Sequence, residues 1–417
     1  MFVRETVALI IFCLVYGIIL AGESSPRKLD RPAAGLIGGV LMVACGILSK
    51  QAAIAAIDFS TLALLFGMMT VVHYAKVCGL LETLAEKLVQ MSHGPIQMLW
   101  IVCLTAGFLS ALFVNDTICL LMTPLLLSIT RRVGLPAEPF LICLATSSNV
   151  GSVMTITGNP QNMLIGQTSG WSWLQFSLYM VPIGLICLLL NGAVVQIMYR
   201  NQLAAASMSL SPGPRDRVTD RRLLIKTSMV LCALLVSLLS GAPTDIAAMC
   251  AAVAMIIWAN RPPEETFAAI DWGLLLFFAG LFIVVEGLTK TQSSAMAQLI
   301  PLFTEHTGSL SGLSLFSIAS VVGGNLFGNV PFVMLIRHSI GHAAHAPLLW
   351  LALAMSSTFA GNLTLVGSVA NLIVAQGAQK ECPLSFWTFL KVGSVTTLIT
   401  VIAGTLILWA YQTRGWL

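Results

Sequence analysis

Polar residues at 115–117 interrupt an apolar segment and carry groups able to bind an ion. In "FVNDTICLLMTP" (113–124) an amide, a carboxylate and a hydroxyl follow one another at Asn115, Asp116 and Thr117. An ionisable group at membrane depth is costly and usually faces an ion path or a proton relay. Asp116 is therefore the sharpest candidate for a coupling-ion position. The alternative is that Asp116 caps a helix near the membrane surface.

A second polar stretch, "NVGSVMTITGNPQN" (149–162), combines helix breakers with amides and hydroxyls. Gly158 and Pro160 break a helix, and the side chains around them are hydrogen-bonding groups that need partners. We predict substrate or ion binding here by Ser148, Asn149, Thr155, Gly158, Asn159, Pro160 and Asn162, and in a matching later stretch by Thr364, Gly367, Ser368 and Asn371. The alternative for each serine or threonine is helix packing with back-bonding to a carbonyl.

The composition indicates that lipid is the solvent. Hydrophobic residues make up 57% of the 417 residues and charged residues 9%. Apolar runs of about 17 to 25 residues, long enough to cross hydrocarbon as helix, recur along the chain. The sequence predicts an all-α polytopic membrane protein. Its basic residues are spread among loops, so the net charge of +4 is not a nucleic-acid signal. The ten scattered cysteines are predicted to be small core residues.

The two halves of the chain are related to each other. Residues 145–167 align without a gap on 354–376 with seven identities in twenty-three positions, and 113–124 aligns on 327–338 with Asn115 on Asn329. We predict a first repeat at 1–200, a linker at 201–222 and a second repeat at 223–417.

Five crossings are predicted in each repeat, at 5–22, 33–48, 59–77, 140–166 and 174–199, and at 223–240, 244–260, 273–289, 346–376 and 387–411. An odd number of crossings makes the second repeat inverted relative to the first. Both 140–166 and 346–376 are predicted to be broken helices. The segments 97–130 and 311–340 are predicted to be re-entrant hairpins, although two full spans in place of each would also fit the loop charges.

Loop charge predicts the orientation. The segment 200–226 holds six Lys or Arg against two Asp, so the positive-inside rule places the linker 201–222 in the cytoplasm and both termini outside.

The hairpin tips are predicted to hold ligands. A tip exposes carbonyls at the end of one half-helix and N–H groups at the start of the next, which favour cations and anions respectively. The second tip, at Gly328, Asn329 and Val330, has no carboxylate. We therefore expect one dominant cation position, a sodium ion or proton near Asn115, Asp116 and Gly158. Inverted repeats with interrupted helices are typical of secondary transporters, with the site near the membrane midplane.

At these residues the chain resembles the ion transporter superfamily of divalent-anion/sodium symporters, citrate-type carriers, arsenite efflux pumps and related sodium/proton antiporters. "NDTICLLMTP" and "GNVPF" resemble the hairpin tips, and "SSNVGSVMTITGNPQN" and "GNLTLVGSVAN" resemble the helix breaks. The resemblance implies a homodimer with elevator-type alternating access. The tips differ from the Ser-Asn-Thr of the dicarboxylate branch and are closer to citrate-transporter-like and arsenite-pump-like permeases.

We predict a secondary active transporter of a small anion or oxyanion across the inner (plasma) membrane, coupled to sodium or protons. The alternatives are a sodium/proton antiporter and an arsenite or antimonite efflux permease on the same fold. The expected partners are the small anionic substrate, the lipid bilayer and a second copy, with no nucleic acid. No enzyme is expected, because H-E-x-x-H and G-x-S-x-G are absent, and no cofactor beyond the coupling ion.

Overall fold

The computed structural model describes residues 2–21, 29–80, 83, 91–206, 220–291, 308–341, 343 and 345–417. Within these residues the regular structure is entirely helical, and seven helices are long and apolar enough to cross a membrane. This confirms the predicted fold class, an all-α multi-pass membrane protein. Residues 207–219 of the predicted linker lie outside the described residues.

The helices of the two repeats follow the same order. The first repeat contains α1 (Phe2–Ala21), α2 (Arg31–Ala44), α3 (Lys50–Ala56), α4 (Phe59–Val77), α6 (Pro95–Leu112), α7 (Asn115–Val133), α8 (Ala137–Ser152), the 3₁₀ turn η2 (Ile156–Gly158), α9 (Pro160–Ser169), α10 (Trp173–Met198) and α11 (Arg200–Ala205). The second contains α12 (Arg221–Leu239), α13 (Thr244–Trp258), α14 (Pro263–Ala268), α15 (Trp272–Lys290), α17 (Leu310–Phe327), α18 (Asn329–Ile340), α19 (Ala346–Ala360), η3 (Leu365–Gly367), α20 (Val369–Ala378) and α21 (Phe386–Thr413).

Both predicted hairpins and both predicted breaks occur as interrupted helices. The hairpin segment 97–130 corresponds to α6 and α7, and 311–340 corresponds to α17 and α18. Each broken helix is two α-helices separated by a 3₁₀ turn. The short helices α3, α11 and α14 were not among the predicted elements, because six or seven residues are too few to give a periodic apolar pattern.

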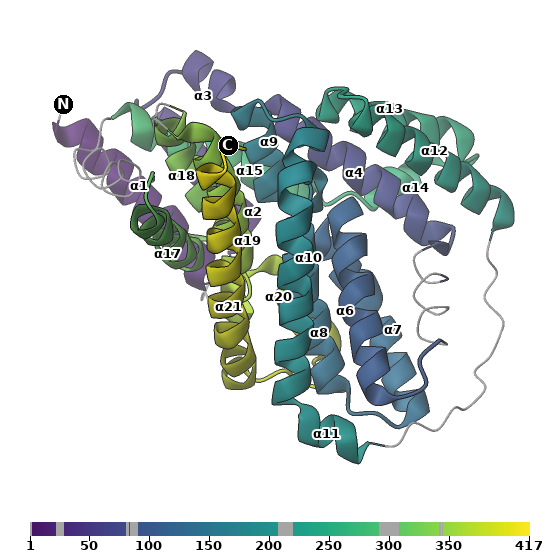
Figure 1. Cartoon of the computed structure of the whole chain (residues 1–417). Coiled ribbons are helices and arrows are strands. Elements are labelled where there is room, and N and C mark those ends of the chain that lie inside the picture. The colour runs from purple at the N-terminus through teal and green to yellow at the C-terminus, as the bar shows by residue number, and fades with distance from the viewer. Residues whose placement is uncertain are drawn as a thin grey trace.

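Packing between the repeats follows an approximate two-fold symmetry. Helix α2 packs on α15, and α4 packs on α13, so each pair joins one repeat to the other. The backbones approach closely at α2 and α15, where a side chain on Gly280 would meet the Gly35 carbonyl. We call α1–α4 together with α12–α15 the frame. Figure 1 shows α1 to the left of the central pair α10 and α21, and α12 and α13 to the upper right.

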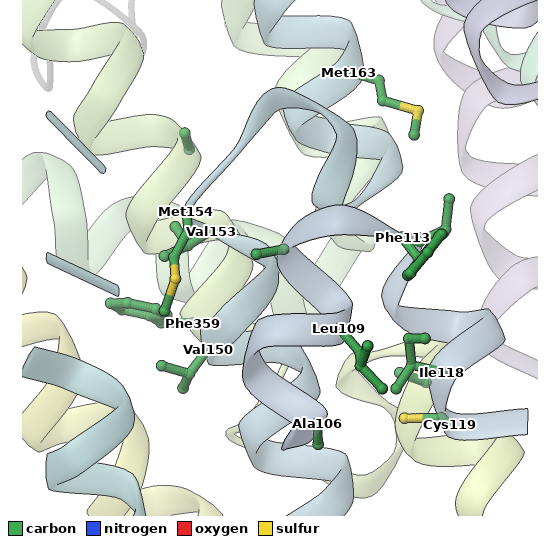
Figure 2. Packing of buried hydrophobic residues seen from close by; sticks show 14 of the residues in the cluster. Ala106, Leu109, Phe113, Ile118, Cys119, Val150, Val153, Met154, Met163 and Phe359 are labelled. Atoms are coloured by element: carbon green, nitrogen blue, oxygen red, sulfur yellow. The ribbon is translucent and has the colours of Figure 1, made fainter. Parts of the chain in front are cut away.

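The hairpins, the broken helices, α10 and α21 form a second body, which we call the core. Here the repeats exchange elements: α7 of the first hairpin packs on α20, and α18 of the second hairpin packs on α9. Close packing of α6 and α8 depends on Gly151, whose α-carbon faces the Gly107 backbone. Figure 2 shows Val153 and Met154, at the first break, beside Phe359 of α19, so apolar side chains of the two repeats interlock at this depth.

The first hairpin enters and leaves by one face. Trp100 in the first turns of α6 donates to Gln196 near the end of α10 over 2.7 Å. Tyr199, just after α10, donates to Glu138 in the first turn of α8 over 2.9 Å. Since α8 begins four residues after α7 ends, both ends of the hairpin lie at the C-terminal end of α10. We call this the linker face; in Figure 1 it is the lower end of the molecule, where α11 lies.

The second hairpin opens to the opposite face. Gly308, just before α17, lies against His345, just before α19. A surface hollow on the same side is bordered by Trp171 before α10 and by Gly341 after α18. Both ends of each hairpin therefore lie on one face, and the two hairpins open to opposite faces, so the two repeats are inverted relative to each other.

Candidate functional site

The tips of the two hairpins turn in different ways. In the first, Phe113 and Val114 are extended and α7 begins at Asn115. In the second, one residue, Gly328, separates α17 from α18 with a φ of 88°, a left-handed conformation that suits glycine. Neither α7 nor α18 has a side-chain cap at its start. Their first backbone N–H groups therefore remain available to a ligand.

A cavity of about 230 Å³ lies between the frame and the core. From the frame it is lined by Ile19, Arg31, Pro32, Asp271, Leu274, Phe277 and Phe278; from the core by Asn115, Asp116, Pro160, Gln161, Phe327, Gly328, Asn329, Val330, Pro331, Val366, Gly367, Ser368 and Val369. It extends from the hairpin tips to the N-terminal ends of α2 and α15. Helix α4 starts beside Arg337, on the side opposite the linker face, and ends beside α14, where the Tyr74 and Thr266 hydroxyls lie 2.7 Å apart. Since α15 follows α14, it starts on the linker-face side, so the cavity reaches towards the linker face.

The cavity is bordered mainly by helix N-termini. The helices α7, α9, α18 and α20 all begin at its wall. Each N-terminus carries roughly half a positive charge, which attracts anions. At α9 the Asn159 side chain accepts from the Asn162 N–H over 2.8 Å, and Pro160 has no N–H to offer. The N–H of Gln161 is thus the free donor of this helix.

Asp116 stands among these positive helix ends. It lines the cavity together with Ser368 and Val369 at the start of α20, where the N-cap is Ser368, whose Oγ accepts from the Ala370 N–H over 3.2 Å. It also interacts electrostatically with Arg31 across the cavity and with Asp271. Asp116 itself lies in the first turn of α7, which has no side-chain cap.

The structure brings together about half of the predicted site residues at the cavity. Those that line it are Asn115, Asp116, Pro160, Gly328, Asn329, Val330, Gly367 and Ser368. Those that lie behind its wall are Thr117, Ser148, Asn149, Thr155, Gly158, Asn159, Thr364, Asn162 and Asn371. The second group supports the breaks and the tips instead of facing the cavity.

Asn149 is the centre of an amide network between the repeats. Its Oδ1 accepts from Asn115 Nδ2 over 2.9 Å and from Ser368 Oγ over 3.0 Å. Its Nδ2 donates to Asn362 Oδ1 over 2.9 Å and to Asn371 Oδ1 over 3.0 Å. This network fixes the first hairpin tip against the second helix break. It also places the tip level with the break, near the middle of α8 and α9 taken together.

Asn162 and Asn371 brace the two breaks in equivalent ways. Asn162 Nδ2 donates to the carbonyls of Ser152 and Thr155, at 3.2 and 3.0 Å. Asn371 Nδ2 donates to the carbonyl of Gly361 over 2.7 Å and to that of Thr364 over 3.0 Å. Both side chains therefore satisfy backbone carbonyls that the broken helix leaves without partners.

The tip asparagines keep an unused acceptor. Asn115 Oδ1 and Asn329 Oδ1 are buried and have no hydrogen-bond partner among the described residues. An amide oxygen in this state is a suitable ligand for a hard cation. Asn115 Oδ1 is adjacent in sequence to Asp116, so the predicted cation position retains two oxygen-bearing side chains.

Sequence reasoning missed Arg31, Asp271 and Asn362. In the sequence Arg31 is one of the loop charges that indicate topology, and Asp271 belongs to "IDW" (270–272), which repeats the "IDF" of 57–59. That repeat was a usable signal, because Asp58 and Asp271 occupy equivalent N-cap positions of α4 and α15.

Asp58 pairs with Arg337 of α18 between frame and core, on the face opposite the cavity opening. The nitrogen–oxygen distance is 4.0 Å, both side chains are largely buried, and the guanidinium lies over the Phe282 ring.

We expect Asp58→Asn and Arg337→Gln to be coupled by about 1 kcal/mol in a double-mutant cycle of unfolding in detergent. The pair Arg131–Glu381 joins two elements of the core at the linker face, with side chains 68% and 42% exposed. As the matched control, it should show no measurable coupling. Equal coupling in the two cycles would contradict the role of the Asp58 pair.

Comparison with known proteins identifies the family. A family model described as citrate transporter matches residues 7–355. The chain belongs to this citrate transporter family. It is therefore a membrane transporter and not an enzyme. Among its relatives are a 46 kDa membrane protein of Mycobacterium leprae, 29% identical over 97% of this chain and 98% of the relative. The silicon efflux transporter LSI3 of Oryza sativa subsp. japonica is 29% identical over 90% of this chain and 92% of its own length.

A more distant relative and a solved structure are also similar to nearly the whole chain. The putative transporter arsB of Dictyostelium discoideum is 23% identical over 94% of this chain and 91% of its own length. The crystal structure of the Alcanivorax borkumensis YdaH transporter is similar over 100% of this chain and 98% of that one, with a TM-score of 0.59 and 13% identity. At that identity the likeness concerns the fold alone. The family match confirms the resemblance to citrate-type carriers that the hairpin and break motifs indicated.

Proposed function

We propose that this transporter moves a small oxyanion across the inner membrane, coupled to sodium or protons. The observation that carries the proposal is the cavity between frame and core. Helix N-termini from both repeats and the guanidinium of Arg31 surround it, with a carboxylate, Asp116, on the same wall. The helix ends and Arg31 attract an anion, and Asp116 can bind the cation that accompanies it.

The coupling position is proposed at the first hairpin tip. Asp116 offers a carboxylate that can take a proton or ligate sodium, and Asn115 Oδ1 is a buried acceptor without a partner. Cation binding there neutralises Asp116 and removes its repulsion of an incoming anion. Anion affinity and cation affinity then rise together, which is the requirement for coupled transport.

Alternating access is proposed to be a movement of the core against the frame. The cavity is formed by both bodies, and the Asp58–Arg337 pair joins them on the side away from its opening. The positive-inside rule puts the linker face in the cytoplasm, so the structure would correspond to a state open inwards. We propose a homodimer with the two cores moving in elevator fashion.

A second candidate is an efflux permease for a neutral hydroxylated acid, exchanged against protons. It is favoured by Asp116, because the charge of this carboxylate at the cavity wall opposes the binding of an anion there. The relatives named as a silicon efflux transporter and a putative transporter arsB point the same way. A third candidate is a sodium/proton antiporter on the same fold, in which Asp116 would bind the exchanged ion.

A stability screen of the purified protein tests the leading proposal. We expect citrate or inorganic phosphate to raise the melting temperature, and the rise to be larger with sodium present or at lower pH. Silicic acid and arsenite serve as neutral comparison solutes at the same pH. Stabilisation by the neutral solutes alone would favour the efflux permease.

Transport in proteoliposomes separates the remaining alternatives. The anion transporter should accumulate labelled anion under an imposed sodium or proton gradient. A sodium-driven pH change without any anion would indicate an antiporter and contradict the leading proposal. Absence of gradient-driven movement of any of these solutes would contradict secondary transport itself.

A further inference from the structure

Arg31 is fixed at the cavity wall by the start of α2. It is the first residue of this helix, whose N-cap Asp30 accepts from the Ala33 N–H over 2.9 Å. One turn later Gly35 lies directly against the Phe277 backbone of α15. The base of the Arg31 side chain is therefore held by the most tightly packed helix pair of the frame. Its half-buried side chain lines the cavity.

Arg31 is the only basic residue among the described residues that line the cavity. Two carboxylates line it as well, but they are not equivalent. Asp271 caps its own helix, with its Oδ1 accepting from the Leu274 N–H over 2.9 Å. Asp116 lines the same cavity as Arg31 and as Ser368 and Val369 at the start of α20. Arg31 and this helix start are the positive features that an oxyanion in the cavity would use.

The partners belong to different bodies. Arg31 is part of the frame, whereas Asp116 and the α20 N-terminus are part of the core. Arg31 shares a cavity with Asp116 and the α20 N-terminus only while the core is in its present position against the frame. A ligand held between Arg31 and α20 would lose the guanidinium when the core moves.

We propose that Arg31 selects the substrate at this site, and that the charge of Asp116 competes with the substrate for Arg31 and the α20 N-terminus until a cation neutralises it. This inference rests on the proposed function and names the substrate class: a small oxyanion with a carboxylate-like or phosphate-like edge. A guanidinium offers a planar fork of donors that fits such an edge. Once Asp116 is neutral, the oxyanion binds the guanidinium, and movement of the core withdraws Arg31 and weakens binding.

Binding to the full-length protein in detergent tests this inference, with citrate and inorganic phosphate as probes. The probe used is the anion that stabilises the wild type. We expect Arg31→Gln to weaken binding of this anion about tenfold to hundredfold. Arg31→Lys should retain part of the affinity, because it keeps the charge but not the fork. Asp116→Asn should strengthen anion binding and remove its dependence on sodium and pH. Arg132→Gln, at an exposed arginine of α7, is the control and should bind like the wild type.

The outcomes separate this inference from the proposed function. If the wild type binds an anion and Arg31→Gln binds it equally well, Arg31 is not the selecting residue. If Asp116→Asn weakens anion binding, Asp116 and the anion do not compete for Arg31. Should Arg31→Gln not fold, Arg31→Met and Arg31→Lys replace it, and equal affinity of these two would overturn the inference. A wild type that neither probe stabilises would overturn the proposed anion transport together with this inference.

Discussion

Asp116→Asn should abolish gradient-driven transport while leaving the protein folded. The amide keeps the size of the carboxylate but can neither take a proton nor balance a sodium ion, so occupancy of the site no longer depends on the gradient. Coupling free energies between two ligands are typically about 1–3 kcal/mol, which corresponds to a loss of roughly 5-fold to 150-fold in gradient-driven accumulation. The measurement is uptake of labelled anion into proteoliposomes with and without an imposed gradient.

Asp271→Asn is the matched control for this prediction. Asp271 lines the same cavity, but its carboxylate is engaged in capping α15. Because asparagine caps a helix about as well as aspartate, its replacement should keep the cap and leave both the stability and the response to the gradient intact. If Asp271→Asn removed coupling and Asp116→Asn did not, the coupling position would have to be moved from the hairpin tip to the frame.

The interrupted helices could be predicted from sequence because their signals are local. Gly158 with Pro160 and the aligned Gly367 mark positions that a continuous helix does not favour, and their recurrence in the two halves identifies them as one feature. Loop charge gave the side of each connection but could not separate a hairpin from two spans. That distinction depended on the depth of the tip, which is given by a contact between distant segments, that of Asn115 with Asn149 beside the helix break.

The residues of the cavity wall could be predicted from sequence only where they belong to the interrupted helices. Asn115 and Asn329 were recognisable as tip residues, whereas Arg31 lies in a loop-proximal position that resembles any basic residue flanking a span. Its importance comes from the packing of α2 on α15, which no local pattern encodes. Several predicted ligands, including Asn162, instead satisfy backbone carbonyls of the breaks, because a polar residue at membrane depth can serve either purpose.

The asymmetry between the repeats has a structural consequence that alignment alone did not give. Asp116 comes from the first repeat, yet its carboxylate lies at the N-terminus of α20 in the second. The position equivalent to Asp116 at the second tip is Val330, and α18 packs on α9 there. A carboxylate of the protein thus lies near the N-terminus of α20, whereas the equivalent residue near the N-terminus of α9 is Val330. An anion and a cation can therefore occupy distinct halves of one cavity.

The second large effect is expected for Asn149→Ala, which removes the residue joining the two repeats. Asn115 Nδ2, Asn362 Oδ1 and Asn371 Oδ1 would each lose a partner in a buried environment. Since a buried polar group left unsatisfied costs about 1–3 kcal/mol, the unfolding free energy in detergent should fall by about 3 kcal/mol or more. The measurement is chemical unfolding followed by the fluorescence of the tryptophans.

The same variant should also lose ligand binding, because the network fixes the first hairpin tip against the break that precedes α20. Asn201→Ala, at an exposed asparagine of α11, is the control and should change neither property. An Asn149→Ala protein as stable as the Asn201→Ala protein would mean that packing around Phe359 and Val153 alone holds the repeats together. Normal stability with lost binding would mean that the network positions the tip without supporting the fold. Only a joint loss supports our interpretation that one set of amides both connects the inverted repeats and builds the transport site.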